Sequence, residues 1–130
     1  MIDASALLEM LLRTQRADQL LQRTLGPSER MHAPHLLDIE VTQVLRRLAL
    51  RKEITASRAQ EALDDLSNLA IERHEHQALL SRIWQLRDSM TAYDGAYVAL
   101  AEALNAPLLT CDAKLAGARG HRATIELSPQ

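Results

Sequence analysis

The sequence contains no phenylalanine, and its only aromatic residues are one tryptophan and two tyrosines among 130 residues. A core with so few rings must be built from Leu, Ala, Val and Ile side chains. The scarcity also argues against proteins that bind single-stranded nucleic acid by stacking bases on aromatic side chains. The single cysteine, Cys111, excludes a disulfide within the chain and fits a reducing cytoplasm.

The chain has neither an excess of basic residues nor a long uninterrupted apolar run. Its formal net charge is −2, whereas nucleic-acid-binding domains are usually basic. The longest apolar-rich stretch, residues 92–109, is interrupted by Asp94, Glu102 and Asn105, which argues against a membrane span. No signal-peptide pattern is present. We therefore expect a cytoplasmic protein.

Length and composition predict a single globular domain covering residues 1–130, because 47% of the residues are hydrophobic and 25% are charged. Apolar periodicity and capping residues predict helices over 4–13, 16–25, 36–51, 55–69, 75–87, 92–104 and 113–118. Short strands are expected over 31–33, 70–73, 107–111 and 123–127. Short apolar strands separated by helices are typical of an α/β fold with a mostly parallel sheet flanked by helices.

Two aspartates follow directly after apolar segments that read as strands. Asp3 comes after Met1 and Ile2, so its strand is expected to be very short, and Asp112 follows the run 107–111. In open α/β sheets, ligands bind at the carboxyl ends of the strands. Asp3 and Asp112 are therefore candidates for a site at that edge.

Two further acids lie at inward positions on predicted helices. Glu40 has Leu36 one turn before it and Val44 one turn after it, where a charge is costly unless it is paired or bound to a metal. The alternative is a border residue whose stem reaches solvent. Asp94 lies in the first turn of the helix over 92–104, where capping is an equally good explanation of an acid.

Four long motifs occur in a fixed order along nearly the whole chain: IDASALLEMLL, APHLLDIEVTQVLRRL, TAYDGAYVALAEALNAPLLTCDAKLA and GHRATIEL. In their order and spacing they resemble PIN-domain ribonucleases of the VapC toxin type. The resemblance implies a PIN-like three-layer sandwich. It also implies an endoribonuclease that depends on Mg²⁺ or Mn²⁺, is held inactive by a cognate VapB-like antitoxin, and commonly forms a homodimer.

The resemblance also implies a set of site residues. The acidic metal-binding and catalytic cluster would be Asp3, Glu40, Asp94 and Asp112, with Ser5 and Thr110 as supporting hydroxyls. Carboxylates without His or Cys suit the hard cations Mg²⁺ and Mn²⁺ and do not suit zinc. Because clustered carboxylates repel one another, we expect some of their pKa values to be raised when no metal is bound.

Cationic side chains offer a possible RNA-binding surface despite the net charge. The candidates are Arg46, Arg47 and Arg51 on the helix that carries Glu40, and Lys114 just after Asp112. Two divalent cations bound to the acids would also shift the net charge from −2 to about +2. The alternative is a solvated helix end whose cations are favoured by the helix dipole.

Other features leave several alternatives open. The five histidines show no zinc spacing with a partner cysteine, and the pair His74 and His76 fits a surface turn better than a metal site. The helix over 4–13 is apolar on more than one side, which favours an antitoxin helix or a second copy against it, unless the fold covers both sides. Another Mg²⁺-dependent phosphoryl-transfer or receiver-like α/β domain, or an inactive PIN-fold binding protein, would also fit parts of the pattern.

Overall fold

The computed structural model describes residues 1–13 and 30–128, so the helix predicted over 16–25 lies outside the described residues. The helices are α1 (Ala4–Arg13), α3 (Leu36–Leu50), α4 (Ala56–Asn68), the 3₁₀ turn η1 (Gln77–Leu79), α5 (Leu80–Gln85), α6 (Ala92–Leu104) and α7 (Ala113–Ala116). The strands are β1 (Met31–Pro34), β2 (Ile71–His74), β3 (Leu108–Thr110) and β4 (Ile125–Leu127).

The strands form two parallel pairs, β1 with β2 and β3 with β4. The N-terminal segment lies beside β3, because Ile2 forms a parallel bridge with Leu109. The Leu109 N–H donates to the Met1 carbonyl (2.8 Å) and the Asp3 N–H donates to the Leu109 carbonyl (3.1 Å). The expected parallel strands are thus confirmed, and this pairing brings Asp3 to the carboxyl end of β3.

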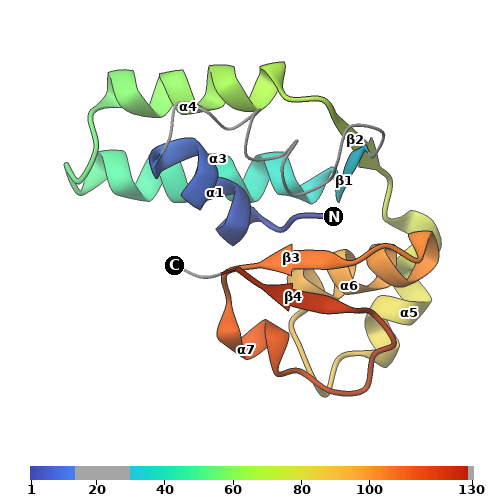
Figure 1. The fold of residues 1–130 in the computed structure, drawn as a ribbon. Coiled ribbons are helices and arrows are strands. Elements are labelled where there is room, and N and C mark those ends of the chain that lie inside the picture. Colours follow the sequence, from blue (N-terminus) through green and yellow to red (C-terminus); the bar gives the residue numbers. More distant parts are fainter. Residues whose placement is uncertain (14–29, 129–130) are drawn as a thin grey trace.

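Helices cover both sides of the strands, as the α/β expectation required. In Figure 1, α1, α3 and α4 lie above β3 and β4, α7 lies below these two strands, and β1 and β2 lie at the level of α3. The core is aliphatic, and Tyr97 is the only aromatic residue among the largest fully buried side chains of the described part of the chain. None of the described helices is long and apolar enough to cross a membrane.

Helix ends follow local hydrogen bonding. Thr55 and Thr91 cap α4 and α6, their hydroxyls accepting from backbone N–H groups in the first turn. Asn105 ends α6 in the left-handed conformation, at φ 49°. On α3, Leu37, Val41 and Leu45 are buried and form the face of the helix that packs into the core.

Several predicted elements were too long. The strand expected over 123–127 is limited to Ile125–Leu127, and the helix expected over 113–118 is limited to Ala113–Ala116. The strand expected over 107–111 is limited to three residues, since Pro107 has no N–H and the Cys111 N–H donates to the Ser5 hydroxyl instead of a strand partner. The helix expected over 75–87 is replaced by η1 followed by the six-residue α5, whose end tightens as the Leu86 N–H donates to both Arg82 and Ile83 carbonyls.

Candidate active site

Asp3 is the buried acid of the site, with 6% of its surface exposed. One carboxylate oxygen accepts hydrogen bonds from the Ser5 hydroxyl (2.7 Å) and from the Ala6 N–H (3.0 Å). The other accepts from the Thr110 hydroxyl. The Ala6 N–H belongs to the first turn of α1, where no backbone acceptor is available, so Asp3 also caps this helix. These contacts fix the carboxylate where the N-terminal segment meets α1.

Ser5 and Thr110 connect Asp3 to the loop after β3. The Ser5 hydroxyl oxygen accepts from the Cys111 N–H (3.0 Å) and lies 3.3 Å from the Thr110 hydroxyl oxygen. Thr110, which is fully buried, accepts in turn from the Asp112 N–H (3.0 Å). The structure therefore brings both predicted supporting hydroxyls into contact with Asp3, and it ties them to the backbone that carries Asp112.

Asp112 differs from Asp3 because its side chain is exposed. One of its oxygens accepts from the Lys114 N–H (2.9 Å), so Asp112 is the N-cap of α7. Asp112 also lines a cavity of about 590 Å³ together with Asp94, and Lys114 and Arg87 contribute to the same wall. Capping α7 and facing this cavity are compatible, since the cap uses one carboxylate oxygen.

Asp94 lies half-buried in the first turn of α6, where Thr91 and not Asp94 is the capping residue. The Thr91 hydroxyl accepts from the Asp94 N–H (3.1 Å). Burial raises the pKa of Asp94, and repulsion from Asp112 and Asp3 raises it further, while Lys114 and Thr91 act in the opposite direction. Asp94 therefore lies within electrostatic reach of both strand-end aspartates.

Glu40, on α3, is half-buried and accepts a hydrogen bond from the Tyr97 hydroxyl (2.6 Å). Burial raises the pKa of Glu40; the Tyr97 hydrogen bond lowers it, and the charges of Asp94 and Asp3 raise it again. Burial and the Glu40 carboxylate likewise raise the pKa of Tyr97. The expectation of raised pKa values is thus met at Glu40 and Asp94.

The polar role of Tyr97 was missed by the sequence analysis. A signal for its polar role was present, since it lies one helical turn after Asp94 and a buried tyrosine hydroxyl normally finds a partner. Arg87 was also missed. Its guanidinium stacks over the Trp84 ring at 4.6 Å, and nothing in the spacing of the sequence indicates that it lines the wall with Asp94.

The donor chemistry of the four acids fits a hard divalent cation. All four side chains offer only oxygen ligands. Two of them, Glu40 and Asp94, have raised pKa values, which the positive charge of a bound cation would lower. Within residues 1–13 and 30–128, no three of them bring ligand atoms within 4.8 Å of one another. Water would therefore complete the coordination, as is usual for Mg²⁺.

A mainly apolar groove of about 670 Å³ lies beside the acids, between α1 and α3. It is lined by Ala4, Ser5, Leu8, Glu9, Leu12, Leu36, Ile39, Glu40, Gln43, Val44, Arg47 and Tyr93. Ile39 and Tyr93 are 68% and 62% exposed. Because Ser5 and Glu40 belong to its lining, the groove reaches the acidic cluster.

The predicted cationic residues are distributed over two surfaces. Arg46, Arg47 and Arg51 are exposed on or just after α3, and Arg47 lines the groove. Lys114 lies instead in the cavity wall with Asp94 and Asp112. The structure thus brings Lys114 to the acids and places the arginines along the neighbouring helix.

Comparisons with known proteins agree with this geometry. A family model described as the PIN domain matches residues 1–120. The chain is 41% identical over 129 residues to the ribonuclease VapC9 of Mycobacterium tuberculosis, covering 99% of this chain and 98% of the relative. It is 43% identical over 127 residues to the ribonuclease VapC1 of the same species, covering 97% and 95%. The chain therefore belongs to the PIN-domain family, alongside the VapC ribonucleases.

Proposed function

We propose that this protein is a Mg²⁺- or Mn²⁺-dependent endoribonuclease that acts in the cytoplasm, as a single PIN domain, as the toxin of a toxin–antitoxin pair. The relatives that this chain matches over almost their whole length are named as ribonucleases. The observation in this chain that carries the proposal is that the four acids lie within electrostatic reach of one another. Besides burial, the charges of Asp112 and Asp3 raise the pKa of Asp94, and those of Asp94 and Asp3 raise the pKa of Glu40. Asp94 and Asp112 also line one cavity.

The role proposed for each residue follows from its contacts in the site. A divalent cation, when bound, supplies an acidified water and neutralises charge that develops on the phosphate. Ser5 and Thr110 orient Asp3, so this carboxylate holds its position without the cation. Asp94 and Asp112 offer their oxygens to the cavity. The Tyr97 hydroxyl occupies one oxygen of Glu40 and leaves the other free to accept a proton or a cation.

Phosphate groups of the RNA would be held by cations around the acids. Lys114 and Arg87 lie in the same cavity wall as Asp94 and Asp112, where they offset the negative charge that would repel RNA. Arg46, Arg47 and Arg51 extend the positive surface along α3. These contacts are electrostatic and independent of base sequence.

The cognate VapB-like antitoxin fits the groove between α1 and α3. An amphipathic helix buries its apolar face in a groove of this kind, and the exposed Ile39 and Tyr93 supply apolar surface for it. A helix seated there would contact Glu40 and so block the acidic cluster directly. We also expect a homodimer, which light scattering of the purified protein tests.

The proposal is tested with purified protein and total RNA, with cleavage ends mapped by sequencing. Cleavage should require Mg²⁺ or Mn²⁺, should stop in EDTA, and should be lost in Asp3→Asn and Asp94→Asn. Glu53→Gln is the matched control, because it removes one exposed acid outside the cavity. Cleavage that survives in both aspartate variants would show that the mechanism is wrong and would favour an inactive binding protein with a contaminating nuclease.

A further inference from the structure

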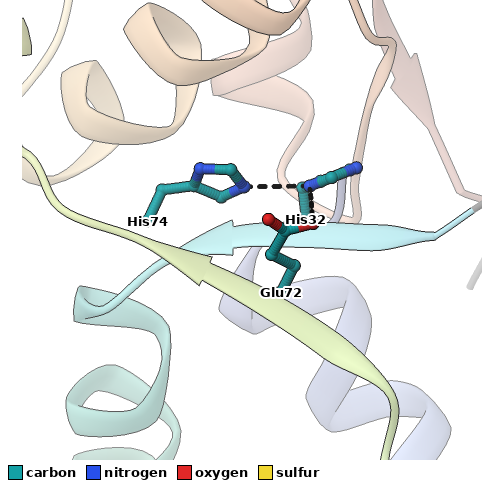
Figure 2. A group of neighbouring side chains, drawn as sticks. All are labelled: His32, Glu72 and His74. Carbon is teal, nitrogen blue, oxygen red and sulfur yellow. Dashed lines mark hydrogen bonds and ion pairs between the residues drawn. The ribbon is translucent and has the colours of Figure 1, made fainter.

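A second group of metal-ligating side chains lies on β1 and β2. His32 Nδ1 is 2.9 Å from His74 Nε2 and 3.6 Å from Glu72 Oε2. Each residue offers one ligand atom, and the three atoms lie within 4.8 Å of one another. Figure 2 shows the three side chains on the same side of the two strands, converging toward one point. None of them lines the acidic cavity or the groove.

The strand pairing creates this group. In the parallel register, His32 is the partner of Glu72 and Pro34 is the partner of His74. Side chains two residues apart on a strand share a face, so Glu72 and His74 both flank His32. The His35 N–H donates to the His74 carbonyl (3.1 Å) and extends the pairing past the strand ends. The three ligand atoms are therefore positioned by backbone hydrogen bonds and not by a loop.

We propose that His32, Glu72 and His74 form a binding site for a borderline divalent cation of the zinc type, separate from the oxygen-only acidic cluster. Two imidazole nitrogens with one carboxylate are typical zinc ligands, whereas Mg²⁺ prefers oxygen. Ligands about 2.0–2.1 Å from a tetrahedral Zn²⁺ lie roughly 3.4 Å apart. The observed separations of 2.9 and 3.6 Å lie on either side of that value.

Only small changes are needed for the cation to bind. Without metal, the two facing nitrogens share one proton in an imidazole–imidazole hydrogen bond. Binding requires both to be unprotonated, which a tautomer change achieves by moving that proton to the far nitrogen of its own ring. The side chains of His32 and Glu72 are 25% and 49% exposed, so a cation can enter from solvent, and water can fill a fourth position.

The neighbouring charges indicate a moderate affinity. Arg30 and the N-terminal ammonium group lie within electrostatic reach of His32 and oppose a cation, while Glu72 favours it. Arg73 is paired with Asp38 through two hydrogen bonds of 2.9 Å, which offsets its charge. A bound cation would fix β1 to β2 and so support the strand that leads directly into α3.

The first test titrates zinc chloride into the metal-stripped protein, with millimolar Mg²⁺ present to occupy the acids. Competition with a chromophoric chelator measures the affinity. We expect one Zn²⁺ per chain, with binding at least tenfold weaker in His32→Gln and in His74→Gln. His76→Gln is the matched control, since this exposed histidine lies outside the group and should leave the affinity unchanged.

The second test uses the unaltered protein, so it does not depend on how the variants fold. Imidazole ¹⁵N resonances should show two of the five histidines changing on zinc addition. Unchanged resonances, changes at His35, His76 or His121 instead, or full zinc binding in the His32→Gln/His74→Gln variant would overturn the proposal. The site does not rest on the nuclease activity, and Mg²⁺-dependent RNA cleavage by His74→Gln measures that activity separately.

Discussion

Asp3 and Asp112 hold corresponding positions in the sequence, each at the end of a short strand, yet they occupy opposite environments. Asp3 is buried and accepts three hydrogen bonds, from Ser5, Ala6 and Thr110. Asp112 is exposed and accepts one, from the Lys114 N–H. The difference arises because Asp3 leads into a helix packed in the core, whereas Asp112 leads into a four-residue helix at the surface. Equal position along a strand does not give equal burial.

The largest expected effect concerns activity, and it should be similar for both acids. In Asp112→Asn, RNA cleavage should fall by more than about 100-fold, since even residues that only support metal ligands commonly cost 10–100-fold. Asparagine caps helices as well as aspartate does, so the free energy of unfolding should change by less than about 0.5 kcal/mol. Cleavage rates and urea unfolding measure the two effects. Cleavage within threefold of the wild type would remove Asp112 from the site.

The second expected effect separates the two acids by stability. Asp3→Ala leaves two hydroxyls and one N–H without their acceptor, so we expect a loss of about 1–3 kcal/mol in the free energy of unfolding. Asp112→Ala loses only a surface cap, which costs about 1 kcal/mol. Urea unfolding without metal measures both. A larger loss for Asp112→Ala would reverse the comparison.

The third expected effect concerns the two acids with raised pKa values, Glu40 and Asp94. A raised pKa means that the folded state binds protons more tightly than the unfolded state, so these groups destabilise the fold above their folded pKa values. The melting temperature of the metal-free protein should therefore rise as pH falls from neutral through those values. Millimolar Mg²⁺ should raise the melting temperature most at neutral pH, where both acids are ionised.

At low pH, the rise in melting temperature should end because of Glu102. Arg82 lowers the pKa of Glu102 to about 2, so its contribution to stability is complete above the ordinary value of 4.5 and is lost as pH falls toward 2. Melting curves of Glu40→Gln/Asp94→Asn serve as the control and should lack the rise. A metal-free wild type whose melting temperature falls steadily from neutral pH would contradict this account.

The smallest expected effect concerns two cationic residues, Lys114 in the wall of the cavity and Arg47 in the groove. Lys114→Ala and Arg47→Ala should each weaken RNA binding and reduce the slope of log affinity against log salt by about 1. Binding is measured with Asp94→Asn, so that the RNA stays intact. We expect Lys114→Ala to have the larger effect, because Lys114 lies in the cavity wall and Arg47 lies in the groove.

Features encoded by neighbouring residues could be predicted from the sequence. Helix α6 begins and ends where the apolar pattern placed it, at residues 92 and 104. Asp3 and Asp112 were recognised because a charge after an apolar run is a local signal. The length of β3 was overestimated because the Cys111 N–H is taken by Ser5, a contact between residues 106 positions apart.

Features that depend on register could not be predicted. His32 and His74 are 42 positions apart and meet only because β1 pairs in parallel with β2. The sequence offered His74 and His76 as the closest pair, yet the structure places His74 against His32 and leaves His76 exposed. The Tyr97–Glu40 hydrogen bond, across 57 positions, depends in the same way on the packing of α6 near α3.

Helix α3 carries Glu40 on the same face as the groove residues Leu36, Ile39 and Arg47. In the proposed complex, the surface that the antitoxin recognises and the surface that serves catalysis therefore cannot vary independently. A substitution on α3 that lets the toxin escape its antitoxin falls within one helical turn or two of Glu40, the proposed catalytic carboxylate, and risks the activity it would release. Such coupling would keep the toxin and antitoxin sequences matched, since substitutions on α3 that weaken antitoxin binding would also tend to reduce the ribonuclease activity.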